Sequence, residues 1–332
     1  MAKQRWTSSD IIKLFKMNER ISKQTLLNAE ARGEIPTAER IPRGSVSARQ
    51  WRIDQLPEIG KIFGFLKPPK EQKIICVYIP KGGVFKTTLS YNLGRILALN
   101  GIKTLFIGVD HQRSLTKYAI PSAKINSLED LSKMQQIGLY HYFFEKIPLS
   151  EIIQHTDLPT LDVLPETSNL NFFAQRLTPE TRREYFFKDK LIPNLTNYQV
   201  IIFDNNPGWT ELVKNSLVAS NVLLAPIGCE AEAYSAVTEH LYTIEEFKNT
   251  IKANWECYLI PTNLKKDSLS QTFYGKYLDL YKDKIISSPI RNTVKGQEAR
   301  ILECSIFEYD PTCPLAQDYY ELIIELWNRM GS

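Results

Sequence analysis

A glycine turn between a strand and a helix constrains the fold of this chain more than any other feature. Residues 74–79 form an apolar run that predicts a buried strand, and residues 89–98 predict a helix. Between them lies the segment Lys81-Gly82-Gly83-Val84-Phe85-Lys86-Thr87-Thr88. The backbone N–H groups of such a turn and the first turn of the helix attract an anion. The segment therefore predicts a phosphate-binding loop, and a plain strand-to-helix turn with incidental lysines is the alternative.

Two side chains of this loop suit a bound phosphate chain and its metal ion. Lys86 is placed to reach the β- and γ-phosphates, and the hydroxyl of Thr87 is expected to bind Mg²⁺ directly. The plain pattern G-x-x-x-x-G-K-[ST] is not met, because Pro80 and Phe85 occupy its two glycine positions.

The loop resembles the deviant Walker A box of the ParA/MinD family, which reads K-G-G-x-G-K-T-T and differs here at Phe85. In that family the early lysine, matched by Lys81, reaches across a nucleotide-sandwich dimer to the phosphates of the partner. The resemblance implies that ATP and Mg²⁺ are the cofactors and that residues 81–88 contact the nucleotide. It also implies that Lys81 and Lys86 take part in hydrolysis.

Two acids stand at the ends of later predicted strands. Residues 101–110 end in Asp110, where the family has the signature D-x-D-P-Q and this chain has Gly108 in place of the first acid. Asp110 matches the acid that positions the attacking water, and it can also hold a Mg²⁺-bound water. A helix cap is the alternative role for Asp110. Residues 198–204 end in Asp204, a Walker B pattern whose carboxylate orients the hydrated Mg²⁺.

The order of strands and helices predicts the fold class. Residues 221–227 and 257–263 read as two more strands with helices between them. Such alternation predicts an α/β fold with a doubly wound, mostly parallel sheet flanked by helices, as in P-loop NTPases, with ligands beyond the strands' C-terminal ends. Asn263 matches the family position that meets the adenine, and an asparagine that caps a turn is the alternative. The family-like region covers residues 72–330.

Basic residues are concentrated at the start of the chain. Residues 1–70 hold 14 Lys and Arg against 7 Asp and Glu, whereas the remainder holds 27 against 30. A basic excess of this kind indicates where a nucleic-acid contact should be sought, although a solvated basic face has the same composition.

Two short predicted helices and a basic hairpin at residues 39–52 predict a winged helix-turn-helix over residues 1–66, followed by a Pro-rich linker at 67–71. The module resembles a MerR-type DNA-binding domain, which plasmid ParA proteins often carry ahead of their ATPase. A small helical dimerisation or capping domain is the alternative. The expected base and phosphate contacts come from the second helix and the wing, namely Ser22, Lys23, Gln24, Thr25, Arg43, Arg49 and Arg52. Arg291 and Lys295 match the family region for nonspecific DNA contacts, and two solvated charges are the alternative.

The resemblance implies an ATPase that partitions plasmid or chromosomal DNA, with weak intrinsic hydrolysis. ATP would join two copies into a homodimer that binds DNA, and a ParB-like adaptor would stimulate hydrolysis. We expect a cytoplasmic protein, because no apolar run is long enough to span a membrane. The resemblance implies that it is associated with the nucleoid. The five scattered cysteines predict reduced thiols and argue against zinc. Two alternatives stay open: a nucleotide-sensing transcriptional regulator with little turnover, and a positioning ATPase for a non-DNA cargo.

Overall fold

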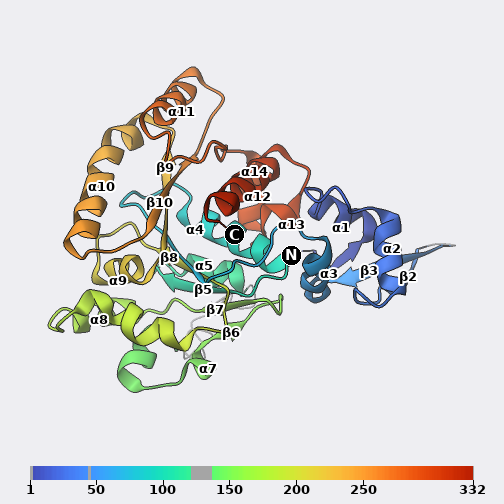
Figure 1. The fold of residues 1–332 in the computed structure, drawn as a ribbon, viewed down its shortest axis with the longest axis horizontal. Coiled ribbons are helices and arrows are strands. Elements are labelled where there is room, and N and C mark those ends of the chain that lie inside the picture. Colours follow the sequence, from blue (N-terminus) through green and yellow to red (C-terminus); the bar gives the residue numbers. More distant parts are fainter. Residues whose placement is uncertain (1–2, 44–45, 121–136, 332) are drawn as a thin grey trace.

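A seven-stranded sheet occupies the centre of the protein in the computed structural model, which describes residues 3–43, 46–120 and 137–331 (Figure 1). Its strands run in the order β10-β9-β4-β8-β5-β7-β6, and all neighbours are parallel except β6 and β7. The strands are β4 Lys73–Val77, β5 Thr104–Val109, β6 Gln154–His155, β7 Leu161–Leu164, β8 Val200–Asn205, β9 Val222–Gly228 and β10 Glu256–Thr262. The predicted doubly wound, mostly parallel sheet of a P-loop NTPase is confirmed.

Helices cover both faces of this sheet, which explains why its strands are apolar runs rather than alternating patterns. Along β4, Ile75 and Val77 belong to the core beneath α4 and α14, whereas Ile74 and Cys76 belong to cores on the opposite face. The helices that follow the phosphate loop are α4 Lys86–Leu99, α5 Ser114–Ala119, α7 Leu149–Ile152, α8 Leu170–Leu177, α9 Glu211–Ala219, α10 Ala231–Thr250, α11 Ser268–Leu280, α12 Val294–Ile301, α13 Ile306–Tyr309 and α14 Pro314–Arg329.

The N-terminal part forms a small module of three helices and a three-stranded antiparallel sheet in the order β1-β3-β2 (Figure 1). The predicted second helix and hairpin are present, and β1, which pairs with β3, was not predicted. The assignment of this module as a winged helix-turn-helix stays a prediction. Its elements are β1 Arg5–Thr7, α1 Ser8–Leu14, α2 Lys23–Ala31, β2 Glu39–Arg43, β3 Val46–Arg52 and α3 Leu56–Phe63.

The N-terminal module shares one hydrophobic core with the sheet domain. One cluster of contacting buried side chains includes residues of both parts, from Trp6 in the N-terminal module to Met330 after α14. The hydroxyl of Tyr320 in α14 donates to the carbonyl of Leu14 at 2.7 Å, and the ammonium of Lys16 lies 4.8 Å from the centre of the Tyr320 ring. The residues of the expected linker therefore join two parts that are packed against each other.

A glycine makes the closest approach between the two parts possible. A Cβ on Gly60 of α3 would lie 1.8 Å from the carbonyl oxygen of Leu99, at the end of α4. No other residue fits at that distance, so α3 can rest on the end of the helix that begins at the phosphate loop.

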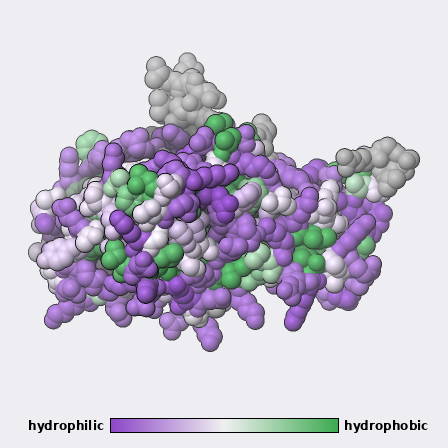
Figure 2. Space-filling view, turned by 90° about the horizontal axis from the view of Figure 1, so that it is seen from above, coloured by the Kyte–Doolittle hydropathy of each residue, from purple (hydrophilic) through white to green (hydrophobic). Residues whose placement is uncertain are grey.

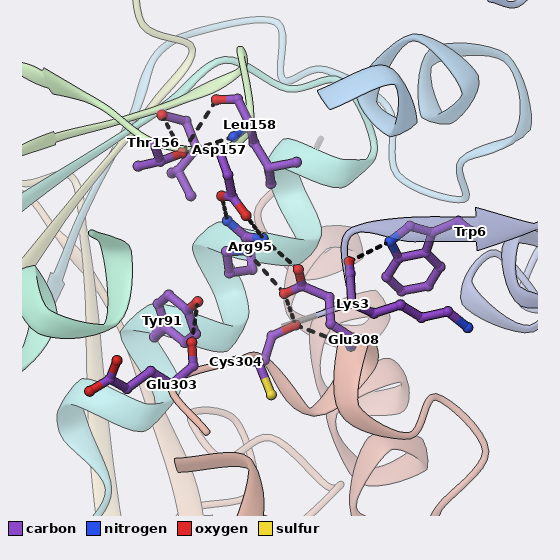
Figure 3. A network of polar contacts seen from close by, with 12 residues as sticks. Lys3, Trp6, Tyr91, Arg95, Thr156, Asp157, Leu158, Glu303, Cys304 and Glu308 are labelled. Carbon is purple, nitrogen blue, oxygen red and sulfur yellow. Dashed lines mark hydrogen bonds and ion pairs between the residues drawn. The ribbon is translucent and has the colours of Figure 1, made fainter. Parts of the chain in front are cut away.

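A buried ion-pair network around Arg95 fixes the middle of α4 (Figure 3). Arg95, whose side chain is 2% exposed, donates from Nε to Glu308 of α13 at 3.0 Å and from Nη1 to Asp157 at 2.5 Å. Glu308 is fully buried and also accepts a hydrogen bond from Ser305. The network ties α4 to α13 and to the segment that leads into β7.

Figure 2 shows one face of the molecule, which is mostly hydrophilic, with small separate groups of hydrophobic residues. Among the residues that the structure describes, no helix has the length and apolarity needed to cross a membrane.

We expect Arg95→Ala to lower the free energy of unfolding by about 3–5 kcal/mol, because it leaves the buried carboxylate of Glu308 without its counter-charge. Arg32→Ala is the matched control, since Arg32 pairs with Glu34 on the exposed surface and its loss should leave stability unchanged. Urea denaturation of the full chain measures both. Equal effects of the two substitutions would contradict the structural role of the network.

Candidate nucleotide-binding site

The predicted phosphate loop joins β4 to α4 at the C-terminal edge of the sheet. Phe85, which precedes α4, has φ 64° and ψ 28°, in the left-handed region where glycine is favoured. Gly83 is left-handed as well, at φ 76°. The phenylalanine therefore adopts the backbone conformation expected of the glycine that it replaces, and it does so under strain.

Lys86 points back into this loop. Its Nζ donates to the carbonyl of Lys81 at 2.5 Å and lies 3.5 Å from the carbonyl of Ile79. Burial lowers the pKa of Lys86 to about 8, against the opposing attraction of Asp204 and Asp110. In place of the two carbonyl dipoles, a bound polyphosphate would offer the partly desolvated Lys86 ammonium a partner with full negative charge.

Asp204 lies fully buried at the end of β8, next to Val77 of β4 and Gly108 of β5 in the sheet register. Its two carboxylate oxygens accept hydrogen bonds from the hydroxyls of Thr87 at 2.7 Å and Ser90 at 2.8 Å. Burial raises the pKa of Asp204 to about 6, while these two bonds oppose the shift. The site thus joins the Walker B acid directly to the hydroxyl predicted to bind the metal ion.

Ser90 is a residue of this site that the sequence reasoning missed. Ser90 lies one turn after Lys86 on α4, and residues at this spacing share one helix face. The four-residue spacing from Lys86 was the sequence signal that could have placed Ser90 in the site. Hydroxyl and carboxylate oxygens are the ligands that Mg²⁺ prefers, so Thr87 and Asp204 fit the expected metal.

Asp110 follows directly after β5, and its side chain is 14% exposed. Its Oδ1 accepts from the backbone N–H of Gln112 at 3.0 Å, which holds the carboxylate in a local turn. Asp110 does not cap the next helix, because α5 begins at Ser114 and the capping position belongs to Arg113. The carboxylate of Asp110 lies close enough to Lys86 and Asp204 that its negative charge raises the pKa of both groups.

Lys81 lies beside α10 and remains accessible. Its side chain is 36% exposed, and Nζ stands 4.0 Å from the carboxylate of Glu232. Gly82 and Gly83 are exposed, and a Cβ on either would meet nothing within 4 Å. Val84 is buried, whereas Thr88 is half-buried.

Asn263 follows β10 with φ 57°. Its amide nitrogen donates to Glu230, and its amide oxygen accepts from Asn292 at 2.7 Å. These bonds hold the side chain at the strand end, and the contact with adenine stays a prediction.

The predicted DNA-contacting residues of α2 stand at the start of that helix. Ser22 and Thr25 form a reciprocal capping box, and Gln24 donates to Asn28 at 2.8 Å. Lys23 is exposed and lines a groove of about 810 Å³ between the helices and the hairpin. Among the described residues that line this groove, four are cations and none is an acid: the cations are Lys13, Lys23, Arg40 and Arg49.

The predicted wing arginines belong to the hairpin strands, with Arg43 on β2 and Arg49 and Arg52 on β3. Arg49 lies 3.6 Å from Glu30, and Arg52 pairs with Asp54 at 2.8 Å. Both would have to share or exchange these acidic partners to contact a phosphate.

Arg291 and Lys295 are also engaged in ion pairs. Arg291 donates two bonds to Asp318, at 2.7 and 2.6 Å, and Lys295 pairs with Asp310. Arg291 lines a small pocket together with Phe85 and Thr88 of the phosphate loop. The role of Arg291 and Lys295 with DNA stays a prediction.

A parallel sheet whose phosphate loop places a buried lysine and a hydroxyl beside a strand-end aspartate defines a P-loop nucleoside triphosphatase. Residues 72–257, more than half of the chain, match the AAA_31 family, described as an AAA domain. The chain therefore belongs to this family, among the partitioning ATPases of the ParA/MinD type, as its loop predicted.

Individual relatives agree with this placement. The chain is 26% identical over 261 residues to the chromosome partitioning protein ParA of Caulobacter vibrioides, covering 77% of this chain and 94% of the relative. It is 28% identical over 257 residues to the sporulation initiation inhibitor protein Soj of Bacillus subtilis, covering 76% and 98%. A putative plasmid partition protein of Borrelia burgdorferi B31, solved bound to AMPPNP, has the same fold with a TM-score of 0.62, 23% identity, and coverage of 78% and 100%.

Substitutions at Phe85 test whether the loop stores backbone strain. Phe85→Ala removes the ring but keeps a Cβ at φ 64°, whereas Phe85→Gly removes both. We expect the glycine variant to be more stable than the alanine variant by about 1 kcal/mol, because a left-handed conformation costs an L-residue roughly that much. Chemical denaturation of the two variants measures the difference. An alanine variant as stable as the glycine variant would show that the loop is unstrained.

Proposed function

We propose that this protein is a ParA-type ATPase that partitions DNA, binding ATP with Mg²⁺ and hydrolysing it. The hydrogen-bonded set of Thr87, Ser90 and Asp204 beside Lys86 is the observation that carries the proposal. Its support includes relatives named as chromosome partitioning proteins and a structural neighbour that binds AMPPNP.

In this function Lys86 exchanges the loop carbonyls for the β- and γ-phosphates, and the backbone N–H groups of the loop bind phosphate oxygens. Thr87 would hold Mg²⁺ directly and Asp204 through water, and a bound ion would supply positive charge beside the phosphates. Asp110 orients the attacking water. The exposed Lys81 leaves Glu232 to reach the phosphates of a second copy, so ATP joins two chains into a dimer.

Two observations favour an active ATPase over a nucleotide sensor with little turnover. Phe85 adopts the left-handed backbone that a glycine at this position would favour, so the substitution is compatible with a phosphate-binding loop. The carboxylate of Asp110 is held by one local hydrogen bond to Gln112 and is not engaged as a helix cap.

The cationic groove of the N-terminal module favours DNA over another cargo. Lys13, Lys23, Arg40 and Arg49 line a concave surface, and of the four Arg49 lies 3.6 Å from an acid, Glu30. Such a cluster of cations suits a phosphate backbone. We propose that this module binds DNA while a ParB-like adaptor stimulates hydrolysis by the ATPase domain. Arg291 and Lys295 add nonspecific contacts once their acidic partners release them.

For catalysis, we expect Asp110→Ala to abolish turnover and to leave ATP affinity within about twofold, because the acid acts on water and not on the phosphate seat. Single-turnover hydrolysis and fluorescent-nucleotide binding measure the two properties. The control is Asp279→Ala, an exposed acid of α11. Hydrolysis at the wild-type rate in Asp110→Ala would refute the role of this acid.

For DNA, we expect Lys23→Ala in the full chain to weaken binding and to reduce the slope of log affinity against log salt by about 1, because one phosphate contact is lost. Lys282→Ala, an exposed lysine in the segment after α11, is the matched control and should change neither quantity. Fluorescence anisotropy over a potassium chloride series measures the slope. An unchanged slope in Lys23→Ala would remove the groove from the DNA-binding surface.

A further inference from the structure

Gly108 of β5 and Glu166, which follows β7, share one small space at the C-terminal edge of the sheet. A Cβ on Gly108 would lie 2.0 Å from Cγ and 2.6 Å from the carboxyl carbon of Glu166. Atoms cannot approach so closely in a close-packed interior, so no side chain fits at position 108 while Glu166 keeps its place. The space beside β5 where the D-x-D pattern leads one to expect an acid is thus filled by the side chain of Glu166, from the segment after β7.

Glu166 is held by a reciprocal pair of hydrogen bonds with Thr116 of α5. Its Oε2 accepts from the backbone N–H of Thr116 at 3.0 Å, and its own N–H donates to the Thr116 hydroxyl at 2.9 Å. The residue at the capping position, Arg113, makes no side-chain cap. Glu166 therefore supplies, from the segment after β7, a hydrogen bond that α5 lacks locally.

This pair of bonds bears directly on Asp110. Residues 110–113 connect β5 to α5, and the N–H of Arg113 bonds back to the carbonyl of Asp110 at 3.0 Å. The connection is short, with one end fixed in the sheet and the other fixed by Glu166 through Thr116. A shift of α5 would consequently move the loop that carries the Asp110 carboxylate.

The second carboxyl oxygen of Glu166 lies beside Gly108. Oε1 is buried, has no hydrogen-bond partner among the described residues, and lies 2.9 Å from the position of a Gly108 Cβ. Gly108 is the register neighbour of Asp204. Burial raises the pKa of Glu166 well above its usual value, with further contributions from Asp204 and Asp110. A carboxyl group that keeps its proton avoids placing a third negative charge beside these two acids.

We propose that Glu166 is a positioning residue of the nucleotide site, which fixes the Asp110 loop through Thr116 and requires that position 108 carry no side chain. The proposal rests on the proposed role of Asp110 in hydrolysis. In this pair Glu166 forms the hydrogen bonds to Thr116, and Gly108 leaves the space that the Glu166 side chain occupies.

The test compares Glu166→Ala and Glu166→Gln in the full chain by amide hydrogen exchange, ATP affinity and single-turnover hydrolysis. In Glu166→Ala we expect exchange of the Thr116 amide to rise and hydrolysis to fall by about tenfold each, as the loss of one buried hydrogen bond predicts. ATP affinity stays within about twofold, because the phosphate seat is untouched. Glu166→Gln keeps the acceptor and the shape, and it should behave like the wild type.

Two further variants keep the test decisive. Asp162→Asn is the matched control, a buried acid of β7, the strand that Glu166 follows, that is bonded to His155 and Tyr198 instead, and it should leave Thr116 exchange unchanged. If Glu166→Ala fails to fold, Thr116→Val is the substitute, because it removes the hydroxyl that accepts from the Glu166 N–H. We expect exchange of the Glu166 amide to rise and hydrolysis to slow in this variant.

Gly108→Ala tests the shared space. The substitution should destabilise the wild type strongly and the Glu166→Ala variant much less, since the second change removes the clash. Additive effects would overturn the pairing of the two residues.

Unchanged Thr116 exchange in Glu166→Ala, or raised exchange with unchanged hydrolysis in that variant, would overturn the positioning role. A wild-type chain with no turnover would contradict the proposed ATPase function itself, and exchange would then report only the structural contact.

Discussion

The arrangement of the nucleotide site depends on how the buried carboxylate of Asp204 is held. It stands between β4 and β5 in the sheet register and accepts from two hydroxyls of α4, those of Thr87 and Ser90. These bonds connect the centre of the sheet to the first turn of the helix that follows the phosphate loop. A carboxylate buried without such donors would be costly, so the two hydroxyls stabilise both the acid and the position of the loop.

Helix α4 extends this arrangement across the molecule. It begins at the phosphate loop with Lys86, is fixed in its middle by the buried Arg95 network, and ends at Leu99 against Gly60 of α3. The N-terminal module is therefore packed on the far end of the helix that would bind the phosphates.

Much of this could be predicted from the sequence because the signals are local. The apolar runs before Lys81, Asp110 and Asp204 identified three neighbouring strands, and the parallel sheet brings their C-terminal ends together. Ser90 and Glu166 were missed because their roles depend on contacts across the fold. Glu166 lies 58 positions after Gly108 in the chain, and only the pairing of β7 with β5 makes them neighbours. The shared core of the two parts was likewise hidden, since a Pro-rich segment suggests a linker whatever its flanks contact.

The central claim is that the loop around Lys86 is an ATP site, and calorimetric titration of the full chain with ATP in the presence of Mg²⁺ tests it most directly. The wild type should bind one ATP per chain, and Lys86→Ala should show no measurable binding, because the variant lacks the charge that meets the β- and γ-phosphates. Lys282→Ala, at an exposed position, should bind as the wild type does. Binding by Lys86→Ala with wild-type affinity would contradict the account.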